Sequence, residues 1–172
     1  LTDTVHSGSI QAAVVDPPYY DSIMYSELSD VFYVLQKEYL SETHPDLFSS
    51  ELTNKTEEAV ANPSKFDGLN SNTSKTKLAK HDYEDKMQEI FSELYDCLEP
   101  GGVLTIMFTH KKTDAWDTLA TSLIEAGFTI TATHPITSEI PTRAGMRGSN
   151  SADSTILLTG RKPVKQKSDT DK

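Results

Sequence analysis

The tetrapeptide Asp16-Pro17-Pro18-Tyr19 places a carboxylate, a stiff backbone and an aromatic ring directly after a run of apolar residues. An exocyclic amino group on a base is a poor nucleophile, because its lone pair is delocalised into the ring. Two oxygen acceptors that hold its two hydrogens favour a pyramidal nitrogen. The Asp16 carboxylate is one such acceptor and the Pro17 carbonyl, aimed in advance by the prolines, is a second. Tyr19 offers a face on which an unstacked base can lie.

The residues that follow the tetrapeptide leave more than one interpretation open. Tyr20 and Tyr25 either line the same base pocket or pack under the next helix. His110, at the end of a second β-rich run, either contacts the ligand or makes a structural hydrogen bond. The whole "DPPYY" stretch has a simpler alternative, a strand-ending turn with surface tyrosines. We predict no metal site, because the five histidines and the single cysteine, Cys97, show no ligand spacing.

Apolar periodicity predicts the elements that must position these residues. The run Gln11–Val15 lacks alternation and is typical of a strand covered on both faces. From Ser26 to about Leu40, apolar residues recur at intervals of three and four, which indicates a helix. Residues 41–81 read as a polar insertion, and Asp82 is the predicted N-cap of a second helix. Further on, the pattern predicts a strand, a helix and two strands: Val103–His110, Thr113–Gly127, Phe128–Ile136 and Ser154–Gly160.

This alternation predicts an α/β fold with a mostly parallel sheet, whose last two strands pair antiparallel at one edge. We expect one catalytic domain over residues 1–162, with the insertion at 41–81 and a disordered tail at 163–172. Four strands are few for such a sheet, and the first is apolar enough to need neighbours on both sides. We therefore expect a further N-terminal segment or a partner subunit.

Composition narrows the function class. The 172 residues, 36% of them hydrophobic, support one modest core. A net charge of −10 argues against tight generic binding to nucleic acid, so any such contact must be local. A single cysteine fits a reducing cytoplasm, and no apolar run is long enough for a membrane span or resembles a signal peptide. We expect a cytoplasmic protein without a membrane partner.

Three stretches carry a resemblance to a known family: "VVDPPYYDSIMYSELSDVFYV", "LEPGGVLTIMFTHKKTDAWDTLATSLIEAGFTITATHPITSE" and "STILLTGRK". They resemble the C-terminal catalytic half of adenine-specific DNA methylases that carry a Zn-ribbon, within the Asp-Pro-Pro-Tyr amino-methyltransferase superfamily. The resemblance implies a partial Rossmann-like methyltransferase fold, S-adenosylmethionine as cofactor and adenine in DNA as substrate. It also implies that Asp16, Pro17, Pro18 and Tyr19 form the catalytic loop.

The sequence departs from that family in two respects. The Phe-x-Gly-x-Gly segment that cradles the methyl donor is absent, and so is the Zn-ribbon. The donor site is therefore expected on a missing segment or a partner subunit. Two alternatives stay open: an RNA amino-methyltransferase, and a non-catalytic truncated half or subunit that needs a partner chain.

Overall fold

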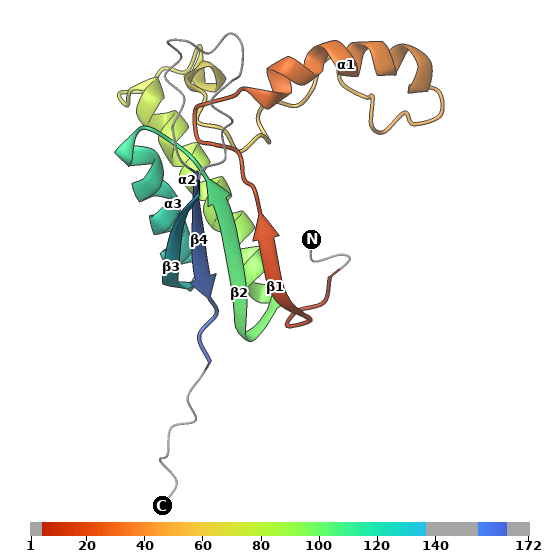
Figure 1. Cartoon of the computed structure of the whole chain (residues 1–172). Coiled ribbons are helices and arrows are strands. Elements are labelled where there is room, and N and C mark those ends of the chain that lie inside the picture. Colours follow the sequence, from red (N-terminus) through yellow and green to blue (C-terminus); the bar gives the residue numbers. More distant parts are fainter. Residues whose placement is uncertain (1–4, 137–154, 165–172) are drawn as a thin grey trace, which may run out of the picture. The chain divides into compact units, whose positions relative to one another are not determined.

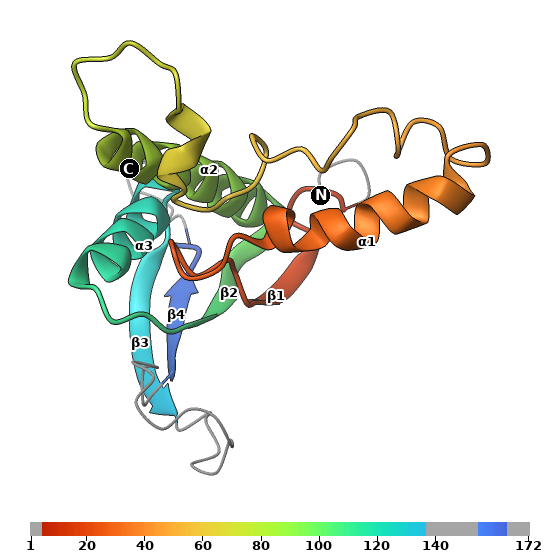
Figure 2. The same ribbon diagram turned by 90° about the horizontal axis from the view of Figure 1, so that it is seen from above.

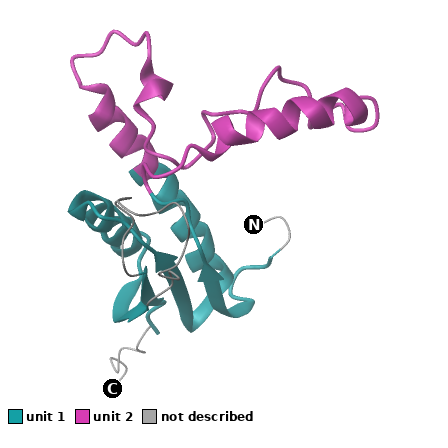
Figure 3. Ribbon diagram, turned by 45° about the horizontal axis from the view of Figure 1, so that its top comes forward, with its two compact units in different colours: residues 1–19, 84–172 teal, residues 20–83 magenta. Residues whose placement is uncertain are grey.

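The computed structural model describes residues 5–136 and 155–164. The chain divides into two compact units, residues 1–19 with 84–172 and residues 20–83, shown in different colours in Figure 3. One boundary falls between Tyr19 and Tyr20, and the other falls inside a long helix. The catalytic loop predicted from the sequence therefore belongs to the first unit, and the residues that follow it belong to the second.

A four-stranded sheet forms the centre of the first unit (Figure 1). The strands are arranged in the order β1-β2-β4-β3. β1 and β2 are parallel, whereas β4 runs antiparallel to both of its neighbours. Three strands thus share one direction, which confirms the α/β fold, and the last two strands pair antiparallel at one edge as predicted. The strand bounds are Ile10–Val15, Leu98–Phe108, Thr129–Ile136 and Thr155–Arg161 for β1 to β4.

Helices cover one face of this sheet. Figure 2 shows α3 (Thr113–Glu125) and the second half of α2 (Lys75–Cys97) on the same side of the strands. Along β2 the residues Leu104, Ile106 and Phe108 are fully buried, while the residues between them are only half-buried. Because side chains alternate along a strand, this pattern shows that the core lies on the helix-covered face.

The prediction that the first strand is covered on both faces is wrong for the described part of the chain. β1 is an edge strand there, with β2 as its neighbour, and the side chain of Val14 is 77% exposed. A continuous apolar run has the same appearance in a strand buried on both faces and in a strand whose second face is bare. The run correctly predicted a strand and incorrectly predicted its surroundings.

The second unit contains α1 (Tyr25–Leu40), which confirms the predicted helix. No residue of α1 is buried. Its polar side is held by the chain that follows: the Ser26 backbone and hydroxyl donate to Glu58, and Thr53 donates to Asp30. Its apolar side is bare. The residues of that side are between 60% and 81% exposed: Leu28, Val31, Phe32, Leu35 and Tyr39.

The polar insertion at 41–81 contains more structure than its composition suggests. A short 3-10 helix, η1 (Pro63–Phe66), lies within it. The second unit also has buried apolar residues, among them Tyr20, Val60, Ala61, Ala79 and Tyr83. The predicted N-cap at Asp82 is wrong, because α2 begins at Lys75. Asp82 lies inside the helix, where its carboxylate accepts from the Lys65 ammonium at 3.2 Å. The domain limits at 1–162 stay a prediction, and residues 165–172 of the predicted tail lie outside the described residues.

Candidate functional site

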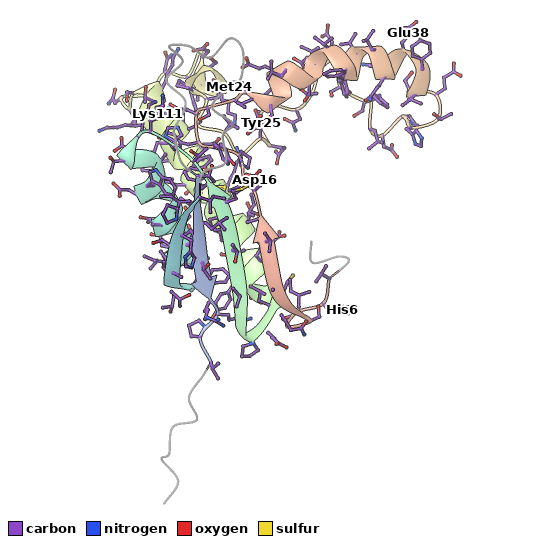
Figure 4. All side chains as sticks on the ribbon, in the orientation of Figure 1. His6, Asp16, Met24, Tyr25, Glu38 and Lys111 are labelled. Atoms are coloured by element: carbon purple, nitrogen blue, oxygen red, sulfur yellow. The ribbon has the colours of Figure 1, made fainter. Side chains whose placement is uncertain are left out.

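The loop Asp16–Tyr19 leaves the carboxyl end of β1, where Figure 4 labels Asp16. β2 runs parallel to β1, with Val15 of β1 opposite Ile106 of β2. The two prolines end the strand because neither can donate to the ladder. In sheets of this kind ligands gather at the carboxyl ends of the strands. The local sequence therefore places the loop at the edge where binding chemistry is expected.

Both residues that carry the proposed acceptors reach the surface. Asp16 is exposed and Pro17 is half-buried. Within residues 5–136 and 155–164, no donor is found for the Asp16 carboxylate or for the Pro17 carbonyl. Two oxygens on adjacent residues thus keep their acceptor capacity, as a pair that holds an amino group requires.

Tyr19 is half-buried, and its ring packs edge-to-face on Phe108, with 5.4 Å between centroids and 77° between planes. Phe108 is the last residue of β2 and is fully buried. Its ring also contacts Trp116 of α3, at 4.9 Å and 88°. An edge-to-face pair contributes about 0.5–1.5 kcal/mol beyond area burial. The core thereby fixes the orientation of the Tyr19 ring.

His110 lies two residues beyond β2, on the turn that leads into α3. Its ring stacks on Phe108 at 6.3 Å, with 20° between the planes. Its Nδ1 accepts from the Lys112 backbone N–H at 3.0 Å, and its carbonyl accepts from Trp116 Nε1 at 2.9 Å. The structural hydrogen bond expected as one alternative is therefore present. It occupies one of the two ring nitrogens.

Tyr20 takes a different environment from Tyr19. It is 7% exposed, and within the second unit its ring packs edge-to-face on Tyr83 at 5.2 Å. Its backbone is left-handed, with φ of 53°, and its carbonyl accepts from the Ala61 N–H at 3.0 Å. Burial raises the pKa of Tyr83, and a hydrogen bond with the Tyr20 backbone opposes that rise. Tyr20 is therefore packed, but against Tyr83 of α2 and not under α1, and its contact with a base stays a prediction.

The structure thus brings four predicted residues together in one unit, namely Asp16, Pro17, Pro18 and Tyr19, and it places the other two in the second unit. Tyr25 is the first residue of α1 and is 39% exposed. No local pattern indicates that Phe108 supports Tyr19, because that contact depends on the pairing of β1 with β2.

Solved structures of one bacterial protein resemble this chain. A protein of Thermus thermophilus, provisionally described as a DNA modification methylase, matches at 14% identity with a TM-score of 0.48, over 98% of this chain and 52% of its own. A second structure of it, in complex with S-adenosyl-L-methionine, matches at 12% identity with a TM-score of 0.44, over 97% of this chain and 52% of its own. This chain spans about half the length of those structures. No family model and no curated protein matches it.

The family resemblance implies that a glycine-containing segment cradles the methyl donor, and glycine-rich turns between a strand and a helix hold nucleotides in related α/β folds. The turns after β1 and β2 contain no glycine; they read Asp16–Met24 and Thr109–Lys112. These turns do not fit that cradle, and no residue is assigned to hold the donor. In the same described part of the chain, no cluster of three metal-binding side chains is found, and no helix is long and apolar enough to cross a bilayer.

Proposed function

We propose that this chain carries the substrate-binding half of an S-adenosylmethionine-dependent methyltransferase that acts on the exocyclic amino group of adenine in DNA. The observation that carries the proposal is a pair of acceptors for which the described residues supply no donor, the Asp16 carboxylate and the Pro17 carbonyl. They directly precede the Tyr19 ring, which packs on Phe108 at the carboxyl end of β1. The family resemblance of the "DPPY" sequence supports the same reaction.

In this mechanism the target base leaves the duplex and stacks on Tyr19, a contact that contributes about 1–3 kcal/mol per base. The two amino hydrogens are donated to Asp16 and to the Pro17 carbonyl. Holding both hydrogens favours the pyramidal nitrogen and localises its lone pair, which makes the nitrogen a better nucleophile. Asp16 need not be a strong base, since the proton can leave after transfer.

Asp16→Asn tests the proposed acceptor. The substitution preserves the shape of the side chain but turns one oxygen into an amide that repels the amino hydrogens. In the complex that supplies the donor site, we expect methyl transfer from labelled donor to fall by about 10²-fold or more, the cost of removing one preorganised group. The control is Asp117→Asn, an exposed carboxylate on α3, which should leave transfer unchanged. Transfer retained in Asp16→Asn would rule out the mechanism.

We propose further that the donor is held by an additional polypeptide segment that adds a strand to β1. In the described part of the chain β1 has only β2 as a neighbour, and Val14 is 77% exposed. Calorimetric titration of the isolated chain with S-adenosylmethionine should therefore show no saturable heat. A binding isotherm from this chain alone would contradict the need for that segment.

DNA is the proposed substrate, and RNA is the alternative to be separated from it. Matched single-stranded DNA and RNA of one sequence, each incubated with labelled donor and the complex that turns over, distinguish them. If the methyl label is incorporated preferentially into RNA, the function is that of an RNA amino-methyltransferase, and the proposed role of Asp16 is unchanged.

A further inference from the structure

We propose that His110 reads the substrate base, by donating its Nε2–H to the ring nitrogen next to the amino group, N1 of adenine. This inference rests on the proposed function and deepens it. Asp16 and the Pro17 carbonyl hold the amino group but do not contact the rest of the base edge. Adenine carries an amino group, which donates, next to an unprotonated ring nitrogen, which accepts. Two acceptors with a donor beside them therefore match this edge of the base.

The position of His110 supports this role. Tyr19 and His110 contact the same ring, that of Phe108, at 5.4 Å and 6.3 Å between centroids. They come from neighbouring parallel strands, and both follow the carboxyl ends of those strands. Tyr19 and the half-buried His110 thus share one supporting ring at this sheet edge, and the proposal places the base that stacks on Tyr19 within reach of His110.

The tautomer of His110 supplies the donor. Because Nδ1 accepts from the Lys112 N–H at 3.0 Å, Nδ1 carries no hydrogen. A neutral imidazole must then carry its hydrogen on Nε2. The proposal requires only that Nε2 bears this hydrogen. It does not require the hydrogen to lack a partner before the base arrives, because binding can exchange one acceptor for another.

Two substitutions separate base reading from a structural role. In His110→Asn the amide oxygen stands near the position of Nδ1, so the Lys112 N–H keeps its acceptor while the distal donor is lost. In His110→Gln the amide nitrogen reaches the position of Nε2, so the donor is kept while the Lys112 N–H loses its partner. Base reading predicts that only the Asn variant loses selectivity. A purely structural role predicts that the Gln variant is the more damaged one.

The probes are single-stranded hexanucleotides, which need no base flipping. One contains deoxyadenosine, one 1-deazaadenine, which lacks the N1 acceptor, and one nebularine, which lacks the amino group. Binding is measured by fluorescence anisotropy at low salt. The wild-type chain should bind the adenine probe about five- to tenfold more tightly than the 1-deaza probe, the range of one net hydrogen bond. His110→Gln should retain this preference and His110→Asn should lose it.

The outcomes distinguish the two proposals. If the wild-type chain binds the adenine and nebularine probes equally, the amino group is not held, and the proposed function fails together with the role of His110. If the amino group matters but the 1-deaza probe binds as well as adenine, only the role of His110 is overturned.

A second measurement follows His110 directly. In a chain labelled with ¹⁵N-histidine, the Nε2 resonance of His110 should shift with the adenine probe and not with the 1-deaza probe. No shift with the adenine probe would overturn the inference.

Discussion

Substitution of Tyr20 by alanine and by glycine sets two structural effects against each other. Either change removes a buried ring that packs on Tyr83, which costs about 3–5 kcal/mol. Alanine must also keep the left-handed backbone, with φ of 53°, at a cost of about 1–2 kcal/mol. Glycine avoids that cost but loses about 0.5–1 kcal/mol of extra chain entropy. The glycine variant should therefore be the more stable by about 0.5–1 kcal/mol.

The assay is urea unfolding followed by circular dichroism, with free energies obtained by linear extrapolation. A matched pair at Ser29, an exposed residue in the interior of α1, serves as the control. There the backbone is helical, so glycine should be the less stable by about 1 kcal/mol. The sign of the alanine-to-glycine difference should thus invert between the two positions of the same unit.

The same sign at both positions would refute the reasoning. It would mean that the contacts of Tyr20 do not hold it in the left-handed region. The inverted sign would show that the backbone immediately after the candidate site carries strain that the Tyr83 and Ala61 contacts offset.

Two further predictions concern charged groups. Lys162 Nζ donates to the Tyr95 and Leu98 carbonyls, at 2.6 and 2.8 Å, and lies 4.5 Å from the centre of the Tyr95 ring. Lys162→Met should therefore lower the free energy of unfolding, measured by urea titration, by about 2 kcal/mol. An equal loss in the control Lys111→Met, at an exposed lysine, would contradict this specific role of Lys162. Hydrogen bonds from Lys55 and Thr53 hold the pKa of Asp30 below its ordinary 3.8. Since the folded pKa is the lower one, this stabilisation is present above pH 3.8 and lost as the pH falls through the folded pKa. The stability difference between wild type and Asp30→Asn should shrink on acidification, whereas a constant difference would refute the linkage.

Local sequence was enough to place the acceptors of the candidate site. An apolar run followed by two prolines defines both the strand and its end, so Asp16 and Pro17 fall at the carboxyl edge without knowledge of the rest of the chain. The contact that supports Tyr19 could not be predicted from local sequence, because Phe108 belongs to β2 and meets Tyr19 only when β2 pairs with β1. Local sequence does not predict the environment of Tyr20 either. Its backbone contact Ala61 lies in the middle of a segment that composition describes only as polar, and its partner Tyr83 lies just beyond that segment.

The misplaced start of α2 has a comparable cause. Asp82 satisfies the local N-cap pattern, because a polar stretch precedes it and an apolar stripe follows it. The helix nevertheless begins at Lys75, where the Ser74 hydroxyl accepts from the Lys77 N–H at 3.4 Å. The first turns of α2 carry few apolar residues, so periodicity could not detect them. The ion pair of Asp82 with Lys65 shows that its side chain serves a tertiary contact and not a cap.

Helix α1 shows why periodicity identifies a helix without identifying its covered side. The apolar stripe predicted one face, yet in the described residues the opposite, polar face makes the contacts, through Ser26, Asp30 and Lys37. Each of these side chains has a directional partner supplied by residues 50–58, so hydrogen bonds position that segment on the helix. Apolar surface attracts any apolar neighbour and encodes no direction. The burial of an apolar face therefore depends on what else is present, whereas the polar contacts are specified by the chain itself.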